Sequence, residues 1–284
     1  MFQTLSHEMF CCRIEETDTT TVPNATPTGG SCGTDLNGKA VIAACEQLAA
    51  LLEPLRAARP DDTWQQIVQR AYQERTQLAA FGFYNTSPLD YDMETNEGSM
   101  FNYLTYGAGC SLVEVDCLTG EHTLLRTDIV MDVGRSLNPA IDVGQIEGAF
   151  LQGWGYMTLE ELLHYPDGSI ANPSLSSYKL PGVRDIPQQL HVTLLRTPGT
   201  RQESVYSSKG VGEPPLTLAV SVVCAIRQAV ESYRTECGQP GLWELSIPLT
   251  SQQVRTACRD EIMQAVTADP DLVPTKQSYL NILQ

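Results

Sequence analysis

The segment that most restricts the fold lies between residues 110 and 133. Its first part, CSLVEVDC, alternates apolar residues with Glu114 and Asp116, so one face of an extended chain is apolar and the other is charged. The residues LTGEH then turn the chain, and TLLRTDIVMDV returns it. This order predicts a β-hairpin whose second strand is more buried than its first.

Two helices are predicted before the hairpin. The first follows the loop TPTGGSCGTD, can be capped by Asp35 or Asn37, and is expected to be closed by Pro54 and Pro60. The second begins at DDTWQQ, where Asp62 and Gln65 have the spacing of a capping box. Apolar residues recur at helical spacing in both segments.

Further elements are predicted after the hairpin. LHVTLLRT (Leu190–Thr197) predicts another strand, and the apolar positions of 216–230 define a buried helix face. Thr250 and Gln253 form a capping box for a final helix that runs through Ala265. We therefore expect an α+β fold in which mixed sheets pack against helices.

The segment NPAIDVGQIEGAFLQGWG contains four glycines, at positions 144, 148, 153 and 155. Each costs a helix about 1 kcal/mol relative to alanine, so we expect another backbone or a ligand to approach this segment closely. Gln145 and Gln152 lie among these small residues. Either side chain could be a solvated or interhelical polar group, or an amide that faces a ligand.

The stretch SSKGVGEPPLTLAV places one carboxylate, Glu213, between Gly212 and two prolines. Pro214 suits the first position of a helix, and a carboxylate just before it is stabilised by the helix dipole, which is a purely structural explanation. The glycines, however, leave room beside the backbone, and the prolines fix its direction, as a general base requires. Lys209 is either a charge partner in this region or a solvated residue.

The loop TGGSCG (Thr28–Gly33) precedes the first predicted helix. Consecutive backbone N–H groups in such a loop can bind an anion with the help of the helix dipole. The pattern is weak, since it lacks both the GK[ST] of a P-loop and the spacing GxGxxG. A flexible loop with no ligand is the alternative.

Composition argues against several classes of function. A net charge of −16 and a pI of about 4.5 disfavour nucleic acid and anionic membranes as partners. No run of eighteen apolar residues occurs, so we expect no membrane span. The nine cysteines form no CxxC pair and the four histidines form no HxxxH or HExxH pattern. We expect reduced thiols and no protein-ligated zinc, iron–sulfur or histidine-bound metal.

Three longer segments occur together: VPNATPTGGSCGTDLNG, YSSKGVGEPPLTLA and, between them, FNYLTYGAGCSLVEVDCLTGEHTLLRTDIVMDVGRSLNPAIDVGQIEGAFLQGWG. In combination they resemble the C-terminal part of the molybdenum hydroxylases, the family of xanthine dehydrogenase/oxidase and aldehyde oxidase. The resemblance runs from about Arg13 almost to the C-terminus. It is far more specific than any single motif within it.

The resemblance implies a molybdenum ion held by molybdopterin. In this family Mo–OH attacks an electron-poor carbon of a purine or aldehyde, and a hydride passes to Mo=S. Glu213 aligns with the glutamate that acts as general base, and Gln145 with a glutamine beside the metal. The backbone of Gly30 and Ser31 is expected nearest the molybdenum. The loop that faces the cofactor aligns with Thr28, Gly29, Gly30 and Ser31.

The two prolines after Glu213 favour xanthine dehydrogenase, which oxidises hypoxanthine and xanthine to urate. Aldehyde oxidase, in which a serine often follows this glutamate, is the alternative. The resemblance further implies 2Fe–2S clusters, FAD and NAD as acceptor in a full-length enzyme, a homodimer, and a cytoplasmic or peroxisomal location.

Family members are far longer than this chain, and MFQTLSHEMFCC does not resemble them. We therefore expect residues 1–12 to be an atypical segment, and 13–284 to be the C-terminal part of the molybdopterin-binding domain of a larger enzyme. The isolated chain is expected to be inactive. A catalytically inactive, truncated product that lacks cofactor is the competing interpretation.

Overall fold

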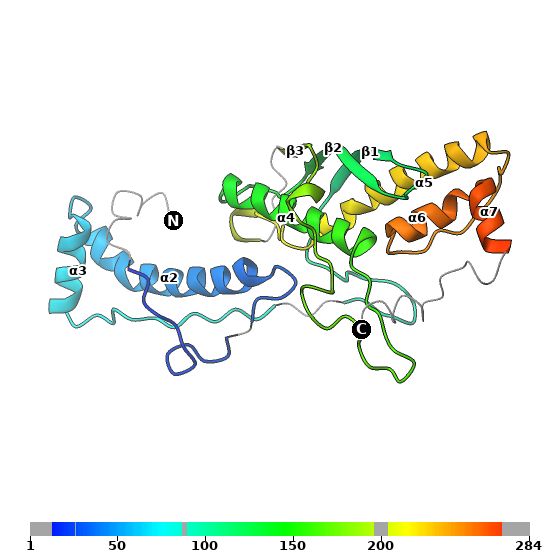
Figure 1. Cartoon of the computed structure of the whole chain (residues 1–284). Coiled ribbons are helices and arrows are strands. Elements are labelled where there is room, and N and C mark those ends of the chain that lie inside the picture. The colour runs from blue at the N-terminus through cyan, green and yellow to red at the C-terminus, as the bar shows by residue number, and fades with distance from the viewer. Residues whose placement is uncertain (1–12, 26, 87–89, 196–203, 269–284) are drawn as a thin grey trace.

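A computed structural model of the chain describes residues 13–25, 27–86, 90–195 and 204–268. The segment expected to be atypical, residues 1–12, lies outside these ranges. Figure 1 shows an elongated arrangement, with the N-terminal helices at one end and the sheet and the C-terminal helices at the other.

The predicted hairpin is present as β1 (Gly107–Val115) and β2 (His122–Met131). The two strands pair antiparallel, with the first residue of β1 opposite the last of β2. As predicted, β2 is the more buried strand. The reason is its central place in the sheet, where Thr127 and Ile129 are almost completely buried.

A third strand, β3 (Gln189–Leu194), pairs parallel with β2, so the strand order is β1-β2-β3. Parallel neighbours need a long crossover connection, and this one includes helix α4 (Pro139–Thr158), which packs against β3. The strand predicted over 190–197 begins one residue earlier. Part of its predicted C-terminal end lies outside the described residues.

The main core covers one face of the sheet. Ile129 and Met131 of β2 meet Ile146 and Phe150 of α4 and Ile226 of helix α5 (Val220–Glu236), all at most 1% exposed. This packing of helices on a mixed sheet confirms the α+β class.

Helix α2 (Gly33–Ala58) begins earlier than predicted and ends two residues before Pro60, one of the two prolines predicted to close it. Pro54, the other, lies inside the helix, because buried Leu52 and partly buried Leu55 pack on the next helix from both sides of it. The cap prediction is also wrong. Cys32 occupies the N-cap without a side-chain hydrogen bond, and Asp35 lies inside the first turn.

The second helix, α3 (Trp64–Gln73), has its capping box one residue later than predicted. Thr63 accepts from the backbone N–H of Gln66, and the Gln66 side chain accepts from the backbone N–H of Thr63. Asp62 instead forms an ion pair with Arg70 at 2.7 Å. Asp62 therefore pairs with Arg70, and Thr63 is the N-cap of α3.

Glu213 is followed by a six-residue 3₁₀ helix, η4 (Pro214–Ala219), which continues directly into α5. The buried face predicted through residues 216–230 is confirmed at Ala219, Ile226 and Val230, none of which is exposed. The first turn is tighter than predicted because the two prolines and their neighbours adopt 3₁₀ geometry.

The last predicted helix is two helices. Thr250 caps α6 (Ser251–Cys258) by accepting from the backbone N–H of Gln253, but Arg259 is left-handed at φ 50° and ends it. A separate helix, α7 (Glu261–Ala268), follows.

The stretch Pro214–Glu236, which comprises η4 and α5, is long and apolar enough to cross a membrane, judged by length and composition alone. Core helices meet the same criteria. Val222, Ile226 and Val230 of α5 are fully buried in the core of the described chain. The stretch is therefore weak evidence for a membrane span.

Candidate functional site

The loop before α2 has the geometry expected of an N–H-rich turn. Gly30 and Ser31 are both left-handed, with φ of 61° and 57°. Because Cys32 provides no side-chain cap, its side chain does not occupy the first N–H groups of the 26-residue helix α2. These donors and the positive end of the helix dipole favour an anionic group at this loop.

Gly210 and Gly212, just before Glu213, allow the segment that carries Glu213 to approach the loop at 28–31 closely. A Cβ atom on Gly210 would lie 3.0 Å from Cβ of Ser31. A Cβ atom on Gly212 would lie 2.9 Å from Oγ of Ser31 and 3.3 Å from Oε1 of Gln145. The room predicted beside these glycines is thus taken by two of the predicted site residues.

The three segments enclose a cavity of about 480 Å³. Its lining includes Thr28, Ser31, Gln145, Gly212 and the buried Lys209. Three of the predicted site residues, Thr28, Ser31 and Gln145, therefore lie at one cavity. Thr28 and Gln145 are 117 positions apart in the sequence (145 − 28). Gly29 and Gly30 belong to the same loop but do not line the cavity, and both are exposed.

Glu213 lies directly after Gly212, at the N-cap of η4. Its side chain is exposed, makes no capping hydrogen bond, and is not part of the cavity wall. Its backbone carbonyl accepts from the N–H of Leu216 over 3.0 Å, which fixes the start of η4. The carboxylate is thus exposed on a rigid turn directly after a residue that lines the cavity.

The glycines of α4 divide into two kinds. A Cβ atom on Gly153 would lie 2.2 Å from the carbonyl oxygen of Leu216, and one on Gly155 would lie 2.5 Å from Pro181. These two confirm the predicted close approach of another segment. Gly144 and Gly148 have nothing within 4 Å of such an atom. They flank Gln145 on the part of α4 that carries the candidate site.

Lys209 resolves an alternative that the sequence left open. Its side chain is only 3% exposed, and Nζ lies 2.5 Å from Oδ2 of Asp132 and 2.8 Å from the carbonyl oxygen of Leu104. It is therefore a charge partner and not a solvated residue. Sequence reasoning gave no signal for Asp132, because the two residues are far apart in the chain and no motif links them.

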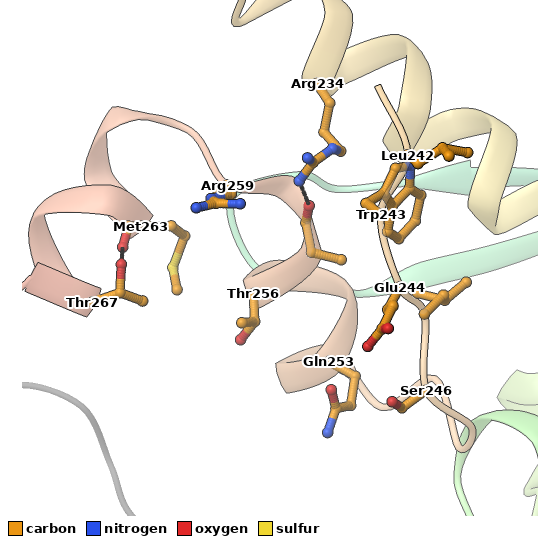
Figure 2. A pocket seen from close by; sticks show the side chains of 12 residues that line it. Arg234, Leu242, Trp243, Glu244, Ser246, Gln253, Thr256, Arg259, Met263 and Thr267 are labelled. Atoms are coloured by element: carbon orange, nitrogen blue, oxygen red, sulfur yellow. Dashed lines mark hydrogen bonds between the residues drawn. The ribbon is translucent and has the colours of Figure 1, made fainter. Parts of the chain in front are cut away.

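A second cavity, of about 580 Å³, lies between the end of α5, residues 242–246, α6 and α7 (Figure 2). The guanidinium of Arg234 lies 5.4 Å from the ring centroid of Trp243 and donates to the carbonyl oxygen of Ala257 over 2.8 Å. No predicted site residue lines this cavity. Its contacts join α5 to α6.

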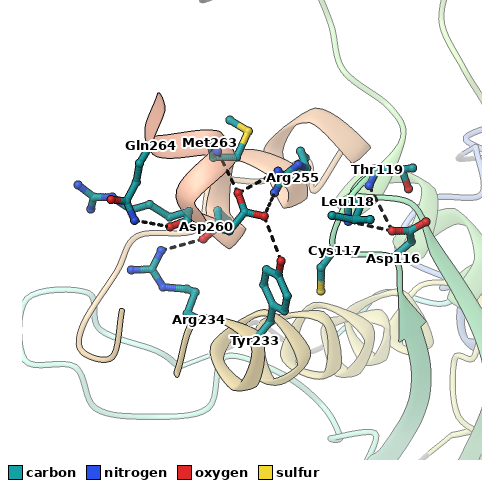
Figure 3. Close-up of polar contacts among 12 residues, drawn as sticks. Asp116, Cys117, Leu118, Thr119, Tyr233, Arg234, Arg255, Asp260, Met263 and Gln264 are labelled. Carbon is teal, nitrogen blue, oxygen red and sulfur yellow. Dashed lines mark hydrogen bonds and ion pairs between the residues drawn. The ribbon is translucent and has the colours of Figure 1, made fainter. Parts of the chain in front are cut away.

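Asp260 connects the same helices (Figure 3). Its carboxylate pairs with Arg255 at 2.9 Å, accepts from the Tyr233 hydroxyl at 3.0 Å, and accepts from the backbone N–H of Met263 at 2.9 Å. The hydrogen bond from Arg255 is the largest of the effects that lower the pKa of Asp260 to about 2. This cluster is a structural anchor at the end of the molecule away from the candidate site.

The donors around the first cavity determine what it could hold. Asp35 and Asp142 also line the cavity, but each carboxylate accepts a hydrogen bond from within the chain, from Tyr103 and Ser136 respectively. The backbone N–H groups, the Ser31 hydroxyl and the Gln145 amide suit an oxygen-rich group better than a bare cation. Within the described ranges, no three His, Cys, Asp or Glu side chains lie together so as to hold a metal ion.

Comparison with known proteins identifies relatives of known class. The family model described as a molybdopterin cofactor-binding domain matches residues 2–187, which include the loop at 28–31 and Gln145 but end before Glu213. Xanthine dehydrogenase from Calliphora vicina is 48% identical over 258 residues, which make up 90% of this chain and 19% of the relative. Aldehyde oxidase 1 from Cavia porcellus is 45% identical over 273 residues, or 95% of this chain and 20% of the relative.

The fold comparison agrees with the sequence comparison. The solved aldehyde oxidoreductase of Desulfovibrio desulfuricans has a TM-score of 0.64 at 24% identity, covering 83% of this chain and 24% of that one. The chain spans about a fifth of the length of the curated relatives it matches. From the family match and these relatives, we conclude that the chain belongs to the molybdopterin cofactor-binding domains of the molybdenum hydroxylases.

Proposed function

We propose that this chain forms one wall of the molybdenum-cofactor site of a xanthine dehydrogenase-type enzyme, with Glu213 as general base. The observation that carries the proposal is the meeting of three segments at one cavity: the loop at 28–31, Gln145 of α4, and Gly212 next to Glu213. Hypoxanthine and xanthine are the proposed substrates, oxidised to urate. Residues 13–284 are the proposed extent of the domain part.

The residues present fit the cofactor. Thr28, Gly29, Gly30 and Ser31 would face it with backbone N–H groups, and the exposed Gly30 has nothing within 4 Å of an added Cβ atom. Gln145 would donate from its amide to an oxygen of the bound group. When bound, the cofactor supplies oxygen transfer to a substrate carbon and accepts two electrons.

Glu213 would accept the proton that is released during this oxygen transfer. Gly212 and the two prolines after Glu213 hold its backbone on a fixed turn, so the carboxylate needs little reorganisation to act. The exposure of its side chain leaves it free to contact a substrate or cofactor at the border of the cavity.

The proposal also includes partners that lie outside this chain. Electrons would leave through 2Fe–2S clusters and FAD to NAD in a cytoplasmic or peroxisomal homodimer. The Calliphora vicina relative carries the name xanthine dehydrogenase and is about five times longer than the matched segment, which supports this part of the proposal.

The test is a graft. The segment of the Calliphora vicina xanthine dehydrogenase that matches this chain is replaced by this chain's residues. We expect xanthine turnover, and in the Glu213→Gln graft a loss of roughly 10²–10⁴-fold at unchanged molybdenum content, as for removal of a general base. The matched control is Glu231→Gln, an exposed glutamate on α5 that should leave turnover unchanged. Full turnover by Glu213→Gln would remove this residue as the base.

A parallel graft into the Cavia porcellus aldehyde oxidase tests the choice of substrate. The two prolines after Glu213 favour xanthine dehydrogenase, so we expect the xanthine dehydrogenase host to turn over xanthine and the aldehyde oxidase host to lose activity on aromatic aldehydes. Activity in the second host alone would favour an aldehyde oxidase.

A second candidate function is a catalytically inactive assembly component. The exposure of Glu213 and its place outside the cavity wall favour this candidate. Molybdenum and pterin analysis of the purified 284-residue chain tests it, with expression in cells that make molybdopterin. Stoichiometric molybdenum together with xanthine oxidation by an artificial acceptor would exclude it.

A further inference from the structure

The hydroxyl of Tyr103 joins two segments of the candidate site that are distant in sequence. It accepts a hydrogen bond from the backbone N–H of Gly210 over 2.8 Å and donates one to Oδ2 of Asp35 over 2.6 Å. Gly210 lies three residues before Glu213, and Asp35 lies in the first turn of α2. One oxygen atom therefore connects both walls of the cavity.

The direction of these two hydrogen bonds is fixed by chemistry. A backbone N–H can only donate, and the Asp35 carboxylate can only accept, so the phenol must keep its proton. Burial, followed by the hydrogen bond to Asp35, raises the pKa of Tyr103 to about 12. The hydroxyl therefore stays protonated at neutral pH and serves both partners.

The segment that carries Tyr103 is itself anchored by the residue before Gly210. Nζ of Lys209 donates to the carbonyl oxygen of Leu104 over 2.8 Å and lies 5.4 Å from the ring centroid of Tyr106. Its backbone N–H donates to the carbonyl oxygen of Val133, two residues after the end of β2, over 3.0 Å. The loop and the tyrosine segment are thus held together on both sides of Gly210.

The packing leaves little freedom at this place. A Cβ atom on Gly210 would lie 3.3 Å from the Tyr103 hydroxyl and 3.0 Å from Cβ of Ser31. Atoms of the tyrosine, the loop at 28–31 and the Gly210 backbone are therefore already in contact. Without the hydroxyl, the N–H of Gly210 and the Asp35 carboxylate would both need a new partner in a half-buried space.

The geometry points to Tyr103 as a positioning residue of the proposed active site, which sets the place of Glu213 relative to the loop at 28–31 through the N–H of Gly210. This inference rests on the proposed function. Tyr103 does not line the cavity, so it acts through Gly210 and not by touching a substrate.

The test compares Tyr103→Phe with Tyr233→Phe in the 284-residue chain. Both variants lose one hydroxyl that donates to a carboxylate, but Tyr233 and its partner Asp260 belong to the anchor at the far end of the molecule. Amide hydrogen exchange is measured by mass spectrometry, and unfolding by urea. We expect Tyr103→Phe to speed exchange about tenfold over residues 207–213, the effect of one lost hydrogen bond. Tyr233→Phe should leave exchange at these residues unchanged.

Turnover in the xanthine dehydrogenase graft distinguishes positioning from stability alone. Tyr103→Phe should lower kcat about tenfold with little change in KM and with normal molybdenum content. Unchanged exchange at residues 207–213, an equal change in both variants, or full kcat in the Tyr103→Phe graft would each overturn the inference. Full turnover by Glu213→Gln would instead overturn the proposed function, so the two failures are distinguishable.

Discussion

At Gly153 of α4, a side chain of any size would collide with the carbonyl oxygen of Leu216. Five residues earlier on the same helix, Gly148 has open space around it. The sequence shows four glycines in α4 and predicts that another segment or a ligand approaches this helix closely. It does not indicate at which glycine the approach occurs. That depends on where η4 crosses α4, which is a long-range property of the fold.

The two kinds of glycine should respond in opposite ways to alanine. Gly153→Ala should lower the free energy of unfolding by roughly 1–3 kcal/mol, because helix α4 and η4 must move apart. Gly148→Ala should raise it by about 0.5–1 kcal/mol, because alanine favours a helix and meets no clash. Urea unfolding of both variants checks the prediction, and destabilisation by Gly148→Ala would show that the space around it is not open.

At the scale of elements, strands were predicted better than helix ends. The alternation in CSLVEVDC fixes which face of the hairpin is buried, and β1 and β2 follow it closely. The ends of helices depend on tertiary contacts that the local sequence does not contain. Leu52 and Leu55 carry α2 past Pro54, and pairing with Arg70 takes Asp62 away from the cap of α3.

Asp260 is the N-cap of α7 and the partner of Arg255, and two substitutions separate these roles. Asp260→Ala should lower the free energy of unfolding by at least about 1 kcal/mol, the usual value of a lost cap. Asp260→Asn should lower the free energy of unfolding by less, because the asparagine amide oxygen can still accept a hydrogen bond from the backbone N–H of Met263. Thermal and urea unfolding at pH 7 measure both.

The same carboxylate predicts a dependence on pH. Because the pKa of Asp260 is lowered to about 2 in the folded chain, its ionised form stabilises the fold above the unfolded-state pKa of 3.8. This contribution is lost as the pH falls from about 3.8 to 2. The difference in stability between Asp260→Asn and the unsubstituted chain should therefore shrink over that interval. A constant difference would contradict the assignment.

At the scale of the whole molecule, the described residues contain one large core and one small one. The large core joins the sheet, α4 and α5, whereas the cluster between α2 and α3 has only three buried members, Leu52, Ile67 and Ala71. Buried apolar area is the main source of stability, so α2 and α3 should open more easily than the rest.

Leu52→Ala tests this division. It should speed amide exchange throughout α3 and the second half of α2, at a cost of roughly 2–3 kcal/mol to that unit, and leave exchange in α5 unchanged. Leu51→Ala, at an exposed position of the same helix, is the matched control and should have little effect. An equal effect of Leu52→Ala on α5 would show that the two cores unfold together.

The residue types of the candidate site could be predicted from the sequence, but the long-range contacts that hold its segments together could not. The glycine-rich loop, Gln145 and the Gly–Glu–Pro–Pro turn are each recognisable from local chemistry. The pairing of Lys209 with Asp132 and the bridge made by Tyr103 join positions more than sixty residues apart. No local pattern specifies such pairs, because they arise only once the sheet has placed both partners.

The meeting of Ser31 with Gly210 also has a consequence for the order of events during synthesis. The ribosome releases the glycine-rich loop before its counterpart, which lies 179 positions further along the chain (210 − 31). N-terminal segments emerge first and must wait for this counterpart. A ligand that contacts both sides of the cavity can therefore meet its complete binding site only after the chain has been made and folded through Gly212.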